Sequence, residues 1–314
     1  EQGMNVARLA VFMAGLPNSV AGMTLNRFCG SSMQAVHIAA GNIQMGAGDA
    51  FICAGVESMS RIPMGGYNYM PSPALFETFP QAYISMGDTA ENLALKYQIA
   101  RLTQEAFALE SQKKAFAAQQ MGHFDDEITP IQSKYGVIDR DGCLRPDSTP
   151  EGLAGLNPAF QATGSVTAGT SSPLTDGAAA VLVCSEDYAD MHGLSKLARI
   201  RSFAVSGCAP EIMGIGPVWS SQKALQRAGL TLGDIDIVEL NEAFAAQSLA
   251  VLRELPIPPD KLNLDGGAIA LGHPLGATGA RITGKAASVL KREGKMKADP
   301  GESLFSQLRR INIH

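Results

Sequence analysis

Hydrophobic positions along this chain alternate between short apolar runs and longer stretches with helical spacing. The runs at residues 49–56, 178–184 and 235–240 have the length and composition of buried strands. Further strands are predicted at residues 23–28, 198–205 and 262–264. Helices are predicted at residues 6–13, after Cys29 to about residue 45, near 88–99 and 103–121, and at 217–228 and 241–252. Strand–helix–strand order with short turns predicts an α/β protein.

The chain divides into two similar halves around an irregular central part. Residues 1–60 with 161–192 form one predicted half and residues 193–314 the other. Between them, clusters of Gly, Pro, Tyr and Phe indicate an inserted loop domain at 61–160. Each half carries a Leu-Asn pair before a helix, ending at Asn26 and Asn241, which indicates an internal duplication. Two such α/β halves place a site between them, at the carboxyl ends of their strands.

Composition narrows the class of protein. Of the 314 residues, 46% are hydrophobic and 18% charged, as in a soluble globular protein. A formal charge of −5 gives no support to nucleic-acid binding as a main role. No apolar run approaches the ~20 residues of a membrane-spanning helix. Five scattered cysteines without metal-site spacing favour a reducing compartment, and hence the cytoplasm, with no bound metal.

Cys29 is the first candidate for chemistry. It lies between a predicted strand and a predicted helix. At a helix N-terminus, the macrodipole and the free backbone N–H groups stabilise a thiolate and can hold an oxyanion. This position predicts a nucleophile with a stabilised thiolate. The alternative is a small buried apolar residue, since free cysteines are commonly buried.

His273 and Asn241 are the next candidates. His273 stands in a glycine-rich run before Pro274, which keeps it out of the helical region and places it at a tight turn. A histidine at such a turn can serve as a general base for a thiol, or can simply bond to local backbone. Asn241 either caps the following helix or holds a water or carbonyl oxygen near the nucleophile. Glu242 is explained by the dipole of that same helix.

These runs together resemble one family. Residues 26–32 (NRFCGSS), 167–169 (TAG), 176–180 (DGAAA), 241–244 (NEAF) and 272–276 (GHPLG) occur in the order found in thiolases. The likeness extends from the start of the chain to about residue 291. Arg27 and the run after Cys29 resemble the degradative 3-ketoacyl-CoA thiolases more than the acetoacetyl-CoA-forming type. Ser85 supports this, because that second type usually has a histidine there.

The resemblance implies a fold and a reaction. The fold is a duplicated, layered α-β-α-β-α arrangement with the inserted loop domain over the substrate. Cys29 would attack the 3-keto carbonyl of a 3-ketoacyl-CoA while His273 takes its proton. Cleavage would release acetyl-CoA and leave an acyl-Cys29 thioester, which CoA resolves. Asn241, through a water, and His273 would form one oxyanion site, and the Cys29 backbone N–H would serve the other.

The resemblance also implies binding residues and partners. Ser172 and Arg145 match positions that contact CoA, and Met86 and Phe244 match positions that line the pantetheine or acyl pocket. Coenzyme A is the substrate, and no other cofactor is implied. A homodimer or homotetramer is expected, and membership of the family suggests a partner in a β-oxidation multienzyme assembly.

The chain departs from the family pattern at both ends. The family's first strand and helix do not precede residue 1. No cysteine follows Cys208, where the family has an acid/base cysteine near its C-terminus, and residues 294–314 carry an atypical tail. Loss of that group is expected to slow the carbanion step by ~10²–10⁴-fold.

Three alternatives to the degradative enzyme remain. They are an acetoacetyl-CoA-forming acetyltransferase, a decarboxylating ketoacyl synthase and a non-catalytic acyl-CoA- or lipid-binding protein. The synthase ranks lower, because it needs a second histidine where this chain has Asn241.

Overall fold

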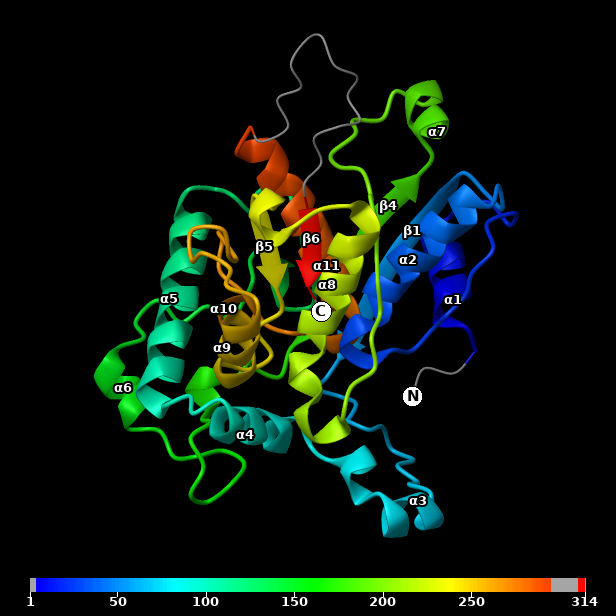
Figure 1. Ribbon diagram of the computed structural model, residues 1–314. Coiled ribbons are helices and arrows are strands. Elements are labelled where there is room, and N and C mark those ends of the chain that lie inside the picture. The colour runs from blue at the N-terminus through cyan, green and yellow to red at the C-terminus, as the bar shows by residue number, and fades with distance from the viewer. Residues whose placement is uncertain (1–3, 295–309, 314) are drawn as a thin grey trace.

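The computed structural model describes residues 4–294 and the backbone of residues 310–313 (Figure 1). Its helices and strands, in chain order, are α1 (Val6–Met13), α2 (Ser31–Gln44), β1 (Ala50–Ser58), α3 (Pro73–Thr78), α4 (Met86–Lys96), α5 (Arg101–Gln120), β2 (Ile131–Ser133), β3 (Gly136–Ile138), α6 (Pro150–Ala154), β4 (Asp176–Cys184), α7 (Glu186–Met191), α8 (Gly216–Ala228), β5 (Ile237–Leu240), α9 (Ala245–Glu254), α10 (Ala268–Leu271), α11 (Leu275–Arg292) and β6 (Arg310–Ile313). Short 3-10 helices lie at η1 (Phe28–Gly30), η2 (Pro80–Tyr83), η3 (Ala168–Thr170), η4 (Pro210–Ile215) and η5 (Leu232–Asp234).

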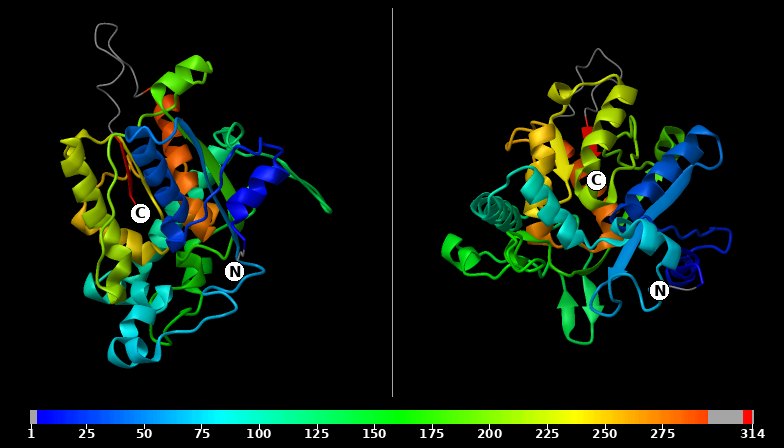
Figure 2. Two further views of the ribbon diagram at one scale, coloured as in Figure 1. Left: turned by 90° about the vertical axis from the view of Figure 1, so that its right-hand side faces the viewer. Right: turned by 60° about the horizontal axis from the view of Figure 1, so that its bottom comes forward.

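Helix α11 is the central element of the fold. On one side it packs, together with α2, against the antiparallel pair β1–β4. On the other it packs against β5, where Val289 and Leu290 form a buried cluster with Ile237. Figure 2 shows α11 and α2 lying side by side. A helix that is buried nearly all round must carry small or apolar residues on most of its surface, as α11 does.

Glycines bring α11 unusually close to its neighbours. A Cβ on Gly279 would overlap the backbone nitrogen of Met33 in α2, and one on Gly55 in β1 would overlap the carbonyl oxygen of Gly276. The approach is close enough for the Ala280 N–H to donate to Ser32 Oγ in α2, at 2.8 Å. The N-terminal turn of α11 is therefore fixed against both α2 and β1.

The strands predicted from continuous apolar runs are confirmed. Residues 49–56, 178–184 and 235–240 correspond to β1, β4 and β5. β1 and β4 pair along their whole lengths, from Ala50 opposite Cys184 to Ser58 opposite Asp176. Residues 262–264 make only an isolated parallel bridge, between Leu262 and Val238. The tail, for which no strand was predicted, supplies β6, which lies parallel to β5.

The strand predicted at residues 23–28 is wrong, because the backbone turns before Cys29. Phe28 has a φ of 45°, in the left-handed region, and its N–H donates to Asn26 Oδ1 at 2.8 Å instead of to a neighbouring strand. The segment ends in the 3-10 turn η1. A side-chain–backbone bond of this kind competes directly with sheet pairing.

The strand predicted at residues 198–205 is also wrong, for a different reason. Side chains of α8 donate hydrogen bonds to the backbone carbonyl groups of this segment. Arg227 Nη1 donates to the Phe203 carbonyl at 2.7 Å, and Lys223 Nζ lies 3.5 Å from that of Val205. In return, Ser202 Oγ donates to the carbonyl of Ala224, at 2.7 Å. Because α8 satisfies these polar groups, the segment runs extended beside a helix without a strand neighbour.

Residues 61–160 contain the predicted helices and one small hairpin. The helices predicted near 88–99 and 103–121 are α4 and α5. Helix α5 packs against α9 and α10, and so joins this part of the chain to the elements around α11. Arg101 Nη2 donates to the carbonyls of Leu153, Ala154 and Leu156, which ties α6 to the start of α5. Across the described residues, every helix is too short or too polar to cross a bilayer.

The close approach of α11 to α2 predicts a strong effect of one methyl group. Gly279→Ala should lower the free energy of unfolding by about 1–3 kcal/mol, because the new Cβ forces the helices apart. Gly41→Ala is the matched control, since a Cβ at this α2 glycine meets nothing within 4 Å. It should leave stability unchanged or raise it, because alanine is the better helix former. Urea unfolding measures both, and equal stability of the two variants would contradict the close packing.

Candidate active site

Cys29 lies in a turn that is held by side-chain hydrogen bonds. It is the middle residue of η1, directly before α2. Ser31 Oγ donates to the Phe28 carbonyl at 2.7 Å and accepts the Arg27 N–H at 2.9 Å. The predicted position at a helix N-terminus is confirmed, and the half-buried thiol is held at a fixed place.

The prediction that this position stabilises a thiolate is wrong for the free chain. Burial raises the pKa of the Cys29 thiol to about 11; a backbone hydrogen bond at Cys29 opposes this, and the nearby Glu57 carboxylate adds to it. Desolvation of the charged form thus outweighs the helix N-terminus. The thiol stays protonated at neutral pH, so a reaction at Cys29 needs a base.

His273 stands at a turn that requires glycine before it. Gly272 has a φ of 90°, and a Cβ there would lie 2.7 Å from Thr175 Cγ2 and 3.0 Å from Cys143 Sγ. The His273 N–H donates to Thr175 Oγ1 at 3.0 Å, which anchors the turn to the segment before β4. The imidazole is 4% exposed. Backbone and ring are therefore both held in place.

Helix α11 connects the turn that contains His273 with the turn that contains Cys29. Helix α11 begins two residues after His273 and packs directly against η1. At its first turn the Gly276 N–H donates to Glu57 Oε2 at 3.0 Å, and the same carboxylate acts electrostatically on Cys29. Glu57 thus lies beside both segments. The structure gathers the predicted nucleophile and the predicted base around the N-terminus of α11.

Asn241 does not cap a helix. Helix α9 begins at Ala245, with Phe244 as its N-cap residue, so the capping interpretation is wrong. The Asn241 side chain is buried, and its Nδ2 lies 3.3 Å from His273 Nε2. Its Oδ1 has no hydrogen-bond partner among the described residues. Rotating the amide by 180° exchanges the two atoms but still leaves one polar atom without a partner. An unpaired buried amide next to an imidazole fits a site for a water or an oxyanion.

Glu242 has a role that the sequence did not indicate. Its dipole interaction with the following helix is ruled out, because that helix begins three residues later. Its carboxylate instead accepts hydrogen bonds from Ser111 Oγ at 2.6 Å, Asn263 Nδ2 at 2.8 Å and the Ile269 N–H at 3.3 Å. Burial raises the pKa of Glu242 against these stabilising bonds. The carboxylate links α5 to α10, the short helix that leads into His273.

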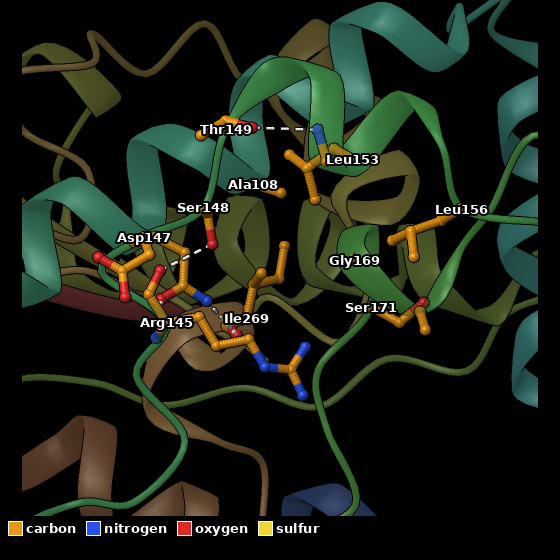
Figure 3. A pocket seen from close by; sticks show the side chains of 13 residues that line it. Ala108, Arg145, Asp147, Ser148, Thr149, Leu153, Leu156, Gly169, Ser171 and Ile269 are labelled. Carbon is orange, nitrogen blue, oxygen red and sulfur yellow. Dashed lines mark hydrogen bonds between the residues drawn. The ribbon is translucent and has the colours of Figure 1, made fainter.

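A cavity of about 200 Å³ is lined by residues of α5, α6 and α10 and by the segments at 145–149 and 168–171 (Figure 3). Arg145, Asp147, Ser148 and Ser171 supply polar lining, and Leu153 and Ile269 supply apolar lining. The Arg145 backbone N–H donates to Gln112 Oε1 at 2.9 Å, which holds the base of its side chain. A cationic group beside apolar walls is suited to an anionic ligand with an apolar part.

Ser172 does not line this cavity, but its neighbour Ser171 does. The Ser172 N–H donates to the Ala243 carbonyl at 3.0 Å, and Ser171 bridges to Phe244. These bonds join the 166–177 segment to the NEAF run. The pairing with residues 243–244 decides that Ser171, and not Ser172, faces the cavity.

Phe160 lies between the start of α4, where Met86 stands, and Phe244. Met86 is the first residue of α4, where Ser85 Oγ accepts the Asp88 N–H at 3.2 Å. Phe160 packs on Gly87 and meets the ring of Phe244 edge to face, with 5.7 Å between centroids. Phe160 therefore connects the start of α4, where Met86 stands, to Phe244. Neither residue lines the cavity that contains Arg145.

Metal-ligating residues do not gather anywhere in the part of the chain that the structure describes: no group of three His, Cys, Asp or Glu side chains is placed to hold an ion.

Comparisons with known proteins agree with these features. The sequence matches the family model described as "Thiolase, N-terminal domain" over residues 1–187 and that described as "Thiolase, C-terminal domain" over residues 194–299. It is 46% identical to the 3-ketoacyl-CoA thiolase of Bacillus subtilis (strain 168), over 94% of this chain and 79% of that protein. It is 50% identical to the 3-ketoacyl-CoA thiolase of Pseudoalteromonas translucida (strain TAC 125), over 90% and 75% of the two chains.

Solved structures give the same result. The fold is similar to the crystal structure of human mitochondrial 3-ketoacyl-CoA thiolase, with a TM-score of 0.84 and 42% identity, over 92% of this chain and 77% of that one. The structure of the human protein in complex with CoA matches with the same TM-score and identity, over 92% and 76% of the two chains.

The raised pKa of Cys29 predicts how its alkylation depends on pH. With a pKa of about 11, the rate of Cys29 modification by iodoacetamide should rise about tenfold per pH unit between pH 7 and pH 10. Mass spectrometry of the Cys29 peptide separates this residue from the other four cysteines. A short unstructured peptide with one cysteine, whose pKa is ~8.5, is the control and should level off within this range. A Cys29 rate that has already levelled off at pH 7 would show a stable thiolate and contradict the desolvation argument.

Proposed function

The chain belongs to the thiolase family, and we propose that it cleaves 3-ketoacyl-CoA with CoA through an acyl-Cys29 intermediate. The observation that carries the proposal is the buried pair of Asn241 and His273 at the N-terminus of α11, packed against the turn that holds Cys29. A protonated thiol, an imidazole and an unpaired amide are the groups that acyl transfer by a cysteine requires. This placement supports Cys29 as nucleophile, His273 as base and Asn241 as a ligand of the oxyanion through a water.

The groups at the site are sufficient for a balanced first half-reaction. Cys29 Sγ bonds to the 3-keto carbon while its proton passes to His273 Nε2. The developing oxyanion is held by hydrogen-bond donors at the site, and collapse of the adduct breaks the C2–C3 bond. The electron pair goes to C2, which takes the proton that His273 holds, and acetyl-CoA leaves. The product on the protein is the acyl-Cys29 thioester.

The second half-reaction regenerates the thiol. The sulfur of CoA attacks the acyl carbon, and the bond to Cys29 Sγ breaks. The proton of the CoA thiol moves, through the imidazole of His273, to the departing sulfur of Cys29. A single base can serve both halves, because it gives back in each step the proton that it takes up.

The Arg145 cavity is the proposed site for the charged part of CoA. Its position between α6 and the loop of Ser171 supports this, since Ser171 bridges to Phe244 and so connects the cavity to the NEAF run of Asn241. Met86 and Phe244 are proposed to line the pantetheine or acyl region; Phe244 contacts Phe160, and Phe160 packs on Gly87, the residue after Met86. The family likeness supports CoA as substrate with no further cofactor.

The assembly and location of the protein are proposed on lesser support. A homodimer or homotetramer fits the exposed apolar face of β1–β4, where Ile52, Val56 and Leu182 are each more than half exposed. A cytoplasmic location rests on the five free cysteines. A β-oxidation multienzyme partner rests on the family likeness.

Trapping the intermediate tests the reaction. Incubation with 3-ketohexanoyl-CoA in the absence of CoA should add one butanoyl group to the Cys29 peptide, detected by mass spectrometry. Cys29→Ala should give no adduct, and His273→Ala should slow its formation by ~10²–10⁴-fold. Cys184→Ala is the matched control, because Cys184 lies at the far end of β4 from the site. A wild-type chain that binds the substrate but forms no adduct would support the non-catalytic binding protein instead.

A charge-removal variant tests the proposed CoA site. Arg145→Ala should raise the Kd for CoA by about tenfold, the effect of losing one charge-assisted hydrogen bond. Arg140→Ala is the control, because this arginine is 79% exposed and lies outside the cavity. Isothermal titration calorimetry measures both. Equal weakening by the two variants would indicate a general electrostatic effect and remove Arg145 from the site.

A further inference from the structure

Thr278 makes a short contact with the proposed base. It lies in the first turn of α11 and has no exposed surface. Its Oγ1 is 2.6 Å from His273 Nδ1, the nitrogen on the opposite side of the ring from Asn241. Oγ1 also lies 3.4 Å from the carbonyl oxygen of Pro274. The imidazole is thus held between a hydroxyl and an amide, both of them uncharged.

We infer that Thr278 is a positioning residue that enables His273 to act as the base for Cys29. The inference rests on the proposed function. To take the thiol proton at Nε2, a neutral imidazole must carry its own proton on Nδ1. That N–H points to Thr278 Oγ1, which accepts it. After proton transfer the imidazolium keeps the same bond, since both of its nitrogens are donors.

The cost of removing the hydroxyl follows from burial. His273 is 4% exposed, so an Nδ1–H without Oγ1 would be a buried donor with its nearest acceptor removed. Leaving a buried donor unpaired costs about 1–3 kcal/mol. The imidazole would then favour the other tautomer, with the proton on Nε2 directed at Asn241. In that tautomer the Nε2 lone pair is absent, and the base function is lost.

A hydroxyl can also donate a hydrogen bond to His273 Nδ1, whereas an ionised carboxylate can only accept one. The Pro274 carbonyl already accepts the N–H groups of Ala277 at 2.7 Å and Thr278 at 3.1 Å, so it holds the Thr278 hydroxyl proton weakly. The hydroxyl can rotate and donate to Nδ1. His273 Nε2–H can then donate to Asn241 Oδ1, the atom that otherwise lacks a partner among the described residues. The Thr278 hydroxyl can therefore pair with both tautomers of His273: the one that accepts a proton at Nε2 and the one that donates a proton from Nε2.

Single-turnover acylation tests this role without requiring carbon–carbon cleavage. Acetyl-CoA is mixed with the full chain, and acetyl-Cys29 is followed by quenched-flow mass spectrometry from pH 7 to pH 9.5. Thr278→Ala and Thr278→Ser differ only in the hydroxyl, so their comparison isolates it. Thr278→Val keeps the volume of threonine and removes only the hydrogen bond. Circular dichroism confirms that each variant is folded.

The expected result is a loss that the conservative variant reverses. At pH 7, Thr278→Ala and Thr278→Val should acylate about tenfold more slowly, and Thr278→Ser should stay close to the wild-type rate. In the slow variants the rate should rise about tenfold per pH unit, because hydroxide replaces the missing base for a thiol with a pKa of about 11. The wild-type profile should be flatter. Glu57, the carboxylate beside both segments, is common to all variants and cancels in the comparison.

Thr283→Val is the matched control. Thr283 lies on the same helix, and its hydroxyl donates to the Gly279 carbonyl at 2.7 Å, away from His273. Its rate and pH profile should match the wild type. Wild-type rate and slope in Thr278→Val and Thr278→Ala would overturn the role of Thr278 while leaving the proposed function intact. A wild-type chain that forms no acetyl-Cys29 would overturn the proposed function itself, and this role with it.

Discussion

The close packing of α11 against α2 and β1 is the constraint on which the rest of the structure depends. Side chains at Gly55 and Gly279 would separate these elements, because backbone meets backbone at each contact. The approach is possible only without a Cβ, and it fixes where the N-terminus of α11 begins. The turn that carries His273 precedes this N-terminus, and the turn that carries Cys29 precedes α2. Packing in the core thus brings together two segments from opposite ends of the chain, one carrying Cys29 and the other leading from His273 into α11.

The chemistry of the site follows from this burial. Desolvation keeps Cys29 protonated, so the thiol does not react until a base takes its proton. The proposed base, His273, contacts two uncharged side chains, Asn241 on one nitrogen and Thr278 on the other. Burial therefore has two opposed effects: it suppresses the free nucleophile, and it strengthens each hydrogen bond that orients the imidazole. A nucleophile that is activated only together with its base is protected from unproductive alkylation and oxidation.

Much of the fold and of the site could be predicted from the sequence, and the failures share a physical cause. Continuous apolar runs predicted β1, β4 and β5, because burial on both faces leaves a clear pattern. The strands predicted at 23–28 and 198–205 failed because side chains satisfy their backbone: Asn26 in the first case, and Arg227 from distant α8 in the second. Motifs identified Cys29 and His273, but not the direction of the Cys29 pKa shift, which depends on packing that no local pattern records. The partners of Glu242 are likewise distant in sequence.

A crystal structure of the chain trapped as acyl-Cys29 tests the central claim most directly, because it locates the reacting sulfur and the proposed base together. The packing of α11 predicts that Cys29 Sγ lies within about 3–4 Å of His273 Nε2, close enough for proton transfer. The acyl carbonyl oxygen should face the Cys29 backbone N–H, and Asn241 should hold a water. An acylated Cys29 whose sulfur lies beyond the reach of His273, with α11 still packed against α2, would show that packing does not bring the two together and would contradict the claim.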